Sequence, residues 1–369
     1  MKSYPLARPY LSKEEETHVL KVLRSGTLSI GPYIEEFEKK FAKTVGVKYA
    51  CAVSSGTAGL HVALIAAGIG PGDEVITSPF SFVASSNAIL YVGATPVFVD
   101  IDPLTYNINP DEVEKKITPK TKAILPVHIF GQCADMGALM ALARKHKLIV
   151  IEDACESLKA EYKGKQAGTF GLAGVFAFYA NKQMTTGEGG MLVTDNKKVY
   201  ETVRSLRNQG RAPNMQWLDH DRLGYNYRMD EMSAALGVVQ LKKLPVSVRE
   251  RQRIAAWYEK YLAPYRDPVL TPRIASYTTH TFFVYVVQIL KPGVKRDSLI
   301  ERLAKKGVAT KPYLPSIHLF SFYQKLLGTK KGDFPISEGV SERSIALPLY
   351  VGLTEKDVKN IVHTLISTL

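Results

Sequence analysis

The sequence predicts an α/β fold: a large domain with a mostly parallel central sheet, followed by a smaller α+β domain. Short apolar strands alternate with helices from about residue 49 to 153, the pattern of a parallel sheet covered on both faces. Mixed helix and strand return after residue 245. The length of 369 residues favours two domains. We place them at residues 1–245 and 246–369, with the N-terminal helix as a candidate to pack on the small domain.

Two helices are expected at the start of the chain. Ser12 and Glu15 have the spacing of a capping box, and Ser25-Gly26 is a stop signal, so the first helix is expected to end near Arg24. The second helix fits residues 32–45, because its apolar residues recur on one face.

Strands and helices then alternate to residue 153. The expected strands are residues 49–53, 74–77, 96–99, 122–127 and 148–151. The expected helices are residues 58–67, 81–92 and 136–146. Gly- and Pro-rich turns between them mark the connections of βα units.

The pattern changes after residue 174. Strands are expected at 175–179 and 190–193 and a helix at 201–206. Residues 208–227 are irregular, polar and aromatic, and a connection of this length is usually functional. A helix from residue 231 to 244 is expected to end near Pro245, because proline breaks the helical hydrogen-bond ladder. A strand at 281–290 and a helix at 296–306 belong to the smaller domain.

The composition indicates an ordinary globular protein, with 46% hydrophobic and 22% charged residues. No apolar run approaches the ~20 residues of a membrane helix, and the N-terminus lacks the apolar core of a signal peptide, so a cytoplasmic location is expected. Three scattered cysteines predict neither a disulfide framework nor a metal site.

The net charge of +13 raises the alternative of a nucleic-acid-binding or regulatory protein. The basic residues, however, are spread along the chain in short pairs and form no run of five or six. The excess charge favours anionic small ligands, and no nucleic-acid or membrane partner is expected.

Three segments carry chemistry, each with a structural alternative. Ser54-Ser55-Gly56-Thr57-Ala58 follows a strand and opens a helix, where backbone N–H groups bind phosphate, although Ser55 or Thr57 can also act as a plain cap. Asp153 ends a strand where ligands bind in α/β sheets, although it can also cap the next segment. Lys182 follows an aromatic run that favours a nucleophilic amine, although a surface lysine is the common alternative.

Together these segments match the needs of pyridoxal 5'-phosphate: a phosphate cup, an acid for the pyridinium nitrogen and a lysine that binds the aldehyde. The order of five motifs, Ser55–Leu60, Thr77–Ser85, Glu152–Glu156, Asn181–Gly190 and Gly224–Met229, strongly resembles the DegT/StrS family of sugar-nucleotide aminotransferases. The resemblance covers essentially the whole chain and implies the fold of aspartate aminotransferase (fold type I of these enzymes).

The resemblance also implies residue roles. Lys182 would be the catalytic residue, holding the cofactor and moving the proton, with pyridoxamine 5'-phosphate as the amino form in the cycle. Asp153 would pair with the pyridinium nitrogen and Phe82 would stack on the ring. The implied cofactor-binding set is Gly56, Thr57, Ala58, Phe82, Asp153, Glu156, Lys182 and Asn226. Asn226 would reach the cofactor phosphate of a neighbouring subunit, which implies a homodimer with shared active sites.

Two further motifs, His280–Tyr285 and Lys311–Leu319, resemble the perosamine-synthase branch. The implied reaction transfers an amino group from glutamate to a nucleotide-linked 4-keto-6-deoxy sugar for cell-surface polysaccharide. The implied substrate-binding set is Ser29, Lys311, Tyr313, His318 and Arg228. His318 can also be a structural histidine in a turn, and His128, which matches no motif, is more simply explained by packing beneath the cofactor or capping a strand.

The chain departs from the family pattern at Ala177, where relatives commonly carry a serine that helps to hold the phosphate. Weaker cofactor binding is expected unless Asn226 and Thr57 compensate. Relatives that use pyridoxamine phosphate for dehydration have histidine in place of the lysine, so Lys182 favours transamination. A sugar dehydratase and a 3-aminotransferase of the same family remain alternatives.

Overall fold

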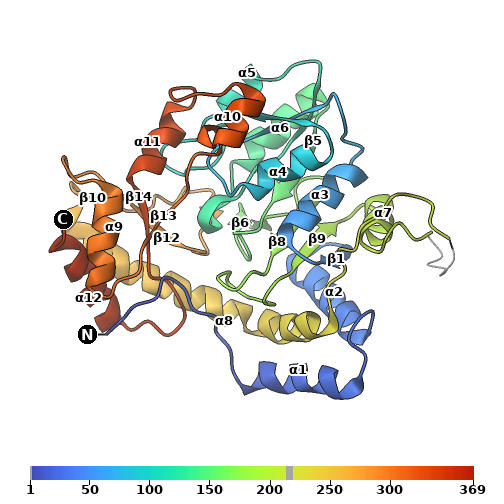
Figure 1. Cartoon of the computed structure of the whole chain (residues 1–369), viewed down its shortest axis with the longest axis horizontal. Helices are drawn as coiled ribbons and strands as arrows, with labels where there is room; N and C mark the ends of the chain where they lie inside the picture. The colour runs from blue at the N-terminus through green and yellow to red at the C-terminus, as the bar shows by residue number, and fades with distance from the viewer. Residues whose placement is uncertain (1, 213–218) are drawn as a thin grey trace.

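The computed structural model describes residues 2–212 and 219–369 (Figure 1). Its central feature is a seven-stranded sheet in the order β1-β9-β8-β5-β4-β2-β3. The strands are β1 (Tyr49–Val53), β2 (Glu74–Thr77), β3 (Thr95–Phe98), β4 (Thr121–Ile124), β5 (Ile149–Asp153), β8 (Ala173–Ala177) and β9 (Gly190–Thr194). Only β9 among these strands runs antiparallel to its neighbours, β1 and β8, which confirms the mostly parallel sheet.

Helices cover both faces of this sheet (Figure 1). They are α2 (Pro32–Val45), α3 (Gly56–Ala66), α4 (Ala84–Tyr91), α5 (Pro110–Lys115), α6 (Met136–His146) and α7 (Lys197–Arg207). Successive strand residues enter opposite cores, since side chains alternate across a strand. Phe176 joins the core that includes α2 and α6, whereas Val175 joins the core that includes α3 and α7.

A second, antiparallel sheet lies in the C-terminal third, in the order β10-β12-β14-β13. Its strands are β10 (Val269–Leu270), β12 (Tyr285–Ile289), β13 (Lys311–Pro312) and β14 (Ser344–Leu347). The helices here are α9 (Arg296–Lys305), α10 (Ser321–Leu327), α11 (Pro335–Arg343) and α12 (Glu355–Ile366), with 3-10 turns η2 (Ala263–Tyr265) and η3 (Ile317–Leu319). A small sheet joins β11 (Thr278–Thr279), β6 (Glu161–Tyr162) and β7 (Lys165–Gln166), and η1 (Ile129–Gly131) follows β4.

The longest helix in the described chain, α8 (Glu231–Leu262), corrects the expectation that a helix ends near Pro245. Pro245 lies inside it, and the helix continues because buried residues such as Leu244 and Val248 pack on both sides of the proline. In Figure 1 α8 runs along one side of the molecule, from the large sheet to the C-terminal sheet. The domain boundary expected at residues 245 and 246 therefore falls within one helix.

The capping box of α1 (Lys13–Ser25) is confirmed, since Ser12 and Glu15 bond each other's backbone groups as expected. This helix lies against the first half of α8, where Gln240 and Lys243 bond Glu15. The preceding segment reaches the small domain instead: Tyr4 packs in its core and pairs with Val308.

Several expected bounds shift. α4 begins at Ala84 rather than residue 81, and β8 lies two residues earlier than expected. β12 begins at Tyr285 rather than residue 281, because Phe282 has a left-handed backbone (φ 48°) that no strand accommodates. No helix in residues 2–212 and 219–369 combines the length and apolar character needed to cross a membrane.

Candidate active site

A cavity of about 370 Å³ opens where β5 and β8 end and α3 begins. This position follows the rule that open α/β sheets bind ligands outside the carboxyl ends of their strands. The large domain supplies most of the wall, and Phe283, Tyr313 and Leu314 of the C-terminal third supply the rest. The cavity thus lies between the two sheets.

Lys182 lies in the tight turn after β8, and its side chain is 13% exposed in the cavity wall. Its Nζ atom lies 3.9 Å from the centre of the Phe283 ring and 3.7 Å from Oε1 of Glu156. The amine therefore faces the cavity between an aromatic ring and a carboxyl group.

Asp153 is the last residue of β5 and is 5% exposed. Its Oδ2 accepts a hydrogen bond from Ser85 Oγ (2.7 Å), and its Oδ1 accepts one from the Cys155 backbone N–H (3.1 Å). The carboxylate is consequently fixed from two directions at the cavity wall, where it can bind a ligand cation. Ser85 was not among the expected site residues, although it lies in the matched motif that contains Phe82.

Glu156 is buried beside Lys182. Its Oε2 accepts a hydrogen bond from the Phe130 N–H (2.8 Å), and its backbone carbonyl accepts one from Gln183 Nε2 (2.7 Å). Burial raises the pKa of the Glu156 carboxyl, while the charge of Lys182 opposes the shift. The sequence-predicted pair Lys182 and Glu156 is thus brought together in one wall.

Helix α3 begins at the cavity, since Ser55, Gly56 and Thr57 all line it. Ser55 Oγ accepts the Ala58 N–H (3.1 Å), so the donor expected from Ala58 is used within the cap. A Cβ atom on Gly56 would lie 2.8 Å from both Ala177 Cβ and Cys155 Sγ, so only glycine fits there. The helix start offers backbone donors and a positive dipole end for an anion.

Phe82 lines the cavity and is 63% exposed, in keeping with a residue at its mouth. Asn226 is exposed and does not line the cavity of its own chain; it pairs instead with Asn208. The neighbouring-subunit role expected for Asn226 concerns a second copy and stays a prediction.

Of the five residues expected to bind substrate, only Tyr313 lines the cavity. Ser29 and Lys311 are exposed elsewhere, and Arg228 Nη1 bonds Asn208 Oδ1 (2.9 Å). His318 is fully buried: its Nε2 lies 2.9 Å from Glu338 Oε1. The expectation that His318 lies near the sugar or diphosphate does not fit this geometry, because the ring packs inside the protein.

Several lining residues were not expected from the sequence. They are Leu60, Ser81, Ala84, Ser85, Val127, Cys155, Tyr179, Asn181, Glu188, Gly189, Phe283 and Leu314. Most lie within the motifs that resemble the family. Their position next to the expected site residues was the signal that could have identified them. Asn181 Oδ1 is buried without a hydrogen-bond partner in the described structure, which leaves an acceptor for a ligand.

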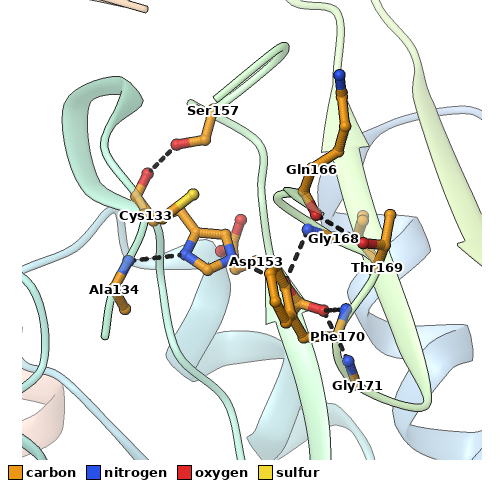
Figure 2. A network of polar contacts seen from close by, with 12 residues as sticks. Cys133, Ala134, Asp153, Ser157, Gln166, Gly168, Thr169, Phe170 and Gly171 are labelled. Atoms are coloured by element: carbon orange, nitrogen blue, oxygen red, sulfur yellow. Dashed lines mark hydrogen bonds and ion pairs between the residues drawn. The ribbon is translucent and has the colours of Figure 1, made fainter. Parts of the chain in front are cut away.

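A polar network around His128 and Glu152 lies next to Asp153 (Figure 2), and the His128 backbone N–H donates to the Asp153 carbonyl (3.0 Å). Nδ1 of His128 accepts the Ala134 N–H (3.1 Å), so Nε2 carries the proton and donates to Glu152 Oε2 (2.9 Å). The Glu152 carboxylate also accepts backbone N–H groups of Gly168, Phe170 and Gly171. His128 lies outside the cavity lining, as the structural interpretation of this residue predicted.

These residues fit pyridoxal phosphate. The cavity presents an amine on Lys182 and a fixed carboxylate on Asp153, and a helix start at Gly56 is available for a phosphate. The unpartnered Asn181 Oδ1 offers a further polar contact. The cavity between these residues has a volume of about 370 Å³.

Comparisons with known proteins agree with this site. The DegT/DnrJ/EryC1/StrS aminotransferase family matches residues 9–366. Similar relatives include GDP-perosamine synthase of Caulobacter vibrioides (40% identity, 98% of this chain and 96% of the relative) and GDP-perosamine synthase of Escherichia coli O157:H7 (38%, 99% and 98%).

Among solved structures, the aminotransferase TlmJ from Streptoalloteichus hindustanus is similar, with a TM-score of 0.92 at 33% identity over 99% of this chain and 98% of that one. This confirms the fold of the pyridoxal-phosphate aminotransferases. The match of almost the whole chain, together with the lysine, carboxylate and helix start in one cavity, shows that the protein belongs to the DegT/DnrJ/EryC1/StrS family and is a pyridoxal-phosphate-dependent aminotransferase.

Proposed function

We propose that the protein transfers the amino group of glutamate to a nucleotide-linked keto-sugar, with a 4-keto-6-deoxy sugar as the preferred acceptor. The observation that carries the proposal is the convergence of Lys182, Asp153 and the start of α3 on one cavity. The similar GDP-perosamine synthases support the choice of sugar.

When bound, pyridoxal phosphate supplies an electron sink that stabilises negative charge on the substrate carbon. Lys182 would hold the cofactor through Nζ, and the same atom would be available to move a proton at the reacting carbon. Asp153, whose carboxylate is fixed by Ser85 and Cys155, would stabilise a positive charge on the ring nitrogen.

The remaining cofactor residues hold and orient the ring. Gly56 and Thr57 would bind the phosphate at the start of α3, Phe82 would cover a ring face, and Glu156 lies beside Lys182 in the cavity wall. Tyr313 faces the incoming sugar from the C-terminal third.

We also propose a homodimer in which Asn226 and Arg228 serve the neighbouring cavity. Both lie on a loop outside the cavity of their own chain, and Arg228 is only partly buried. Light scattering of the purified protein tests the dimer, since a monomeric mass for active protein would exclude a shared site.

The test of the function begins with the visible absorbance band of lysine-bound cofactor. The protein supplied with pyridoxal phosphate should show the band, and glutamate should remove it. Lys182→Ala should lose both the band and turnover while keeping its circular dichroism. Lys311→Ala is the matched control, because this lysine is exposed and lies outside the cavity, so its band should be unchanged.

The acceptor is identified by a glutamate-coupled assay against 4-keto and 3-keto sugar nucleotides linked to GDP, UDP or dTDP. We expect an aminated product from a 4-keto-6-deoxy sugar. A product only from 3-keto sugars would identify a 3-aminotransferase, and a dehydrated sugar would identify a dehydratase; either result contradicts the proposed acceptor. The absence of a band would exclude the cofactor role of Lys182.

A further inference from the structure

Arg251 of α8 is a buried cation that the proposed chemistry does not use. It is 3% exposed, and its Nη1 donates to the backbone carbonyls of Phe283 (3.1 Å), Phe282 (3.3 Å) and Leu349 (3.4 Å). None of the ion pairs among the described residues includes it, and burial lowers its pKa to about 10. Burying a charge without a partner ion is unfavourable. The hydrogen bonds to the three carbonyls must therefore offset this cost.

A second side chain on the same face of α8, that of Ser247, contacts the backbone beside Lys182. Ser247 lies four residues before Arg251, so the two share one helix face. Its hydroxyl donates to the carbonyl of Gln183 (2.8 Å), the residue after Lys182. One turn of α8 thus bonds the backbone next to Lys182 and the backbone that carries Phe283.

The segment held by Arg251 is strained. Phe282 has φ 48°, a left-handed conformation that is unfavourable for a non-glycine residue and persists only when its surroundings fix it. Phe283 then donates its N–H to the Phe130 carbonyl (2.9 Å), and the Phe130 N–H bonds Glu156. Both neighbours of the Lys182 amine, the Phe283 ring and the Glu156 carboxyl, therefore depend on this junction.

We propose that Arg251 is a positioning residue: it holds the Phe282–Phe283 turn so that the Phe283 ring packs against the Lys182 amine. Three carbonyls from two chain segments converge on one guanidinium nitrogen. The proposal rests on the role proposed for Lys182.

The test compares Arg251→Met and Arg251→Lys with Arg253→Met. Arg253 lies on the same helix but is exposed, pairs with Glu250 and stacks on Trp257, so its variant should behave as the parent protein. For Arg251→Met we expect kcat to fall about tenfold or more with KM changed less than threefold, since a small misplacement of reacting groups affects turnover strongly. Arg251→Lys should restore part of kcat.

The pH midpoint of the visible band supplies a reading that needs neither glutamate nor sugar. Glu156 and Cys155 interact electrostatically with Lys182, and Asp153 and Tyr313 interact with Glu156. The other ionisable residues of the cavity wall are Tyr179 and Glu188, and all of these groups are unchanged in the variants. A shifted midpoint in Arg251→Met therefore reports a changed environment of the amine.

An Arg251→Met protein that melts earlier but keeps the parent midpoint and kcat would overturn the proposal, because Arg251 would then be structural only. If Arg251→Met does not fold, Arg251→Gln, which is also uncharged, takes its place: a parent-like midpoint and kcat overturn the proposal, and altered values support it. A parent protein without a band is the separate failure of the role proposed for Lys182.

Discussion

Residues 2–212 and 219–369 include two buried histidine–glutamate pairs, one in the large domain and one in the C-terminal third. His128 and Glu152 lie behind Asp153 in the large domain, whereas His318 and Glu338 join η3 to α11 in the C-terminal third. Both imidazole rings are 0% exposed, and both pairs have an Nε2–carboxylate distance of 2.9 Å. In the sequence, His318 lies in a motif that resembles the perosamine-synthase branch, whereas His128 matches no motif.

The difference lies in how completely each pair is hydrogen-bonded. Both ring nitrogens of His128 have partners, and both oxygens of Glu152 accept two hydrogen bonds. Nδ1 of His318 is buried without one in the described structure, and Glu338 Oε2 accepts only from Gly332. A buried network is strongly stabilising only when it is complete, so the pair that matched no motif should matter more for stability.

The largest effect is therefore expected for Glu152→Gln. The side-chain amide places an NH₂ group against N–H donors, so at least two of the four hydrogen bonds to this group are lost. Each buried donor left without an acceptor costs about 1–3 kcal/mol, so the free energy of unfolding should fall by about 2–6 kcal/mol. Urea unfolding of the protein without added cofactor, followed by circular dichroism, measures this loss.

Glu338→Gln is the matched comparison. Its amide nitrogen can take the Oε2 position, which accepts one bond, while the oxygen keeps the bonds from His318, Gly332 and Phe334. We expect a loss of about 1 kcal/mol, the net worth of one hydrogen bond. Equal losses in the two variants would show that completeness of the network does not separate the pairs.

An intermediate effect is expected for His318→Phe, which keeps a ring but removes the hydrogen bond to Glu338. The variant should lose about 1–3 kcal/mol of the free energy of unfolding, because a buried acceptor loses a partner. Since the ring lies inside the protein, KM for the sugar nucleotide should change less than threefold.

Steady-state kinetics on the folded variant separates the two interpretations of this histidine. A KM raised tenfold or more, with an unchanged free energy of unfolding, would show that His318 contacts the substrate. That result would contradict the buried geometry. Such a result would require η3 to open when the sugar binds, because Ile317 is fixed to the Pro79 carbonyl in the structure.

The sequence predicted the large-domain half of the site better than the other half, for a physical reason. Lys182, Asp153 and Gly56 lie at strand ends or helix starts, where local pattern determines direction, and all three line the cavity. Lys311 lies in the two-residue strand β13 and His318 in η3, and the course of this part of the chain depends on long-range contacts such as those of Pro79 with Ile317 and of Asp100 with Ser337. Local pattern does not contain those contacts.

The same reasoning explains the errors at Pro245 and at the start of β12. Proline normally ends a helix, but here the apolar faces before and after it are both buried, and tertiary packing outweighs the local preference. Phe282 belongs to an apolar, aromatic run that favours a strand, yet the carbonyls bonded by Arg251 hold it in a turn.

The smallest effect is expected for Ala177→Ser, at the end of β8 in the cavity wall. Ala177 packs against Gly56 at the start of α3, so a hydroxyl here would lie beside the proposed phosphate position. One added hydrogen bond is worth about 0.5–1.5 kcal/mol, which predicts an affinity for pyridoxal phosphate about two- to tenfold higher. Titration of the cofactor-free protein, followed by the visible band, measures the change.

Ala180→Ser is the control for this titration, because Ala180 lies three residues further along the chain and does not line the cavity. Its affinity should equal that of the parent protein. If Ala177→Ser binds the cofactor no more tightly than Ala180→Ser, the phosphate does not lie at the start of α3. The ring would then have to lie in another orientation, and the pairing of Asp153 with its nitrogen would fail as well. This modest variant consequently tests the placement of the whole cofactor.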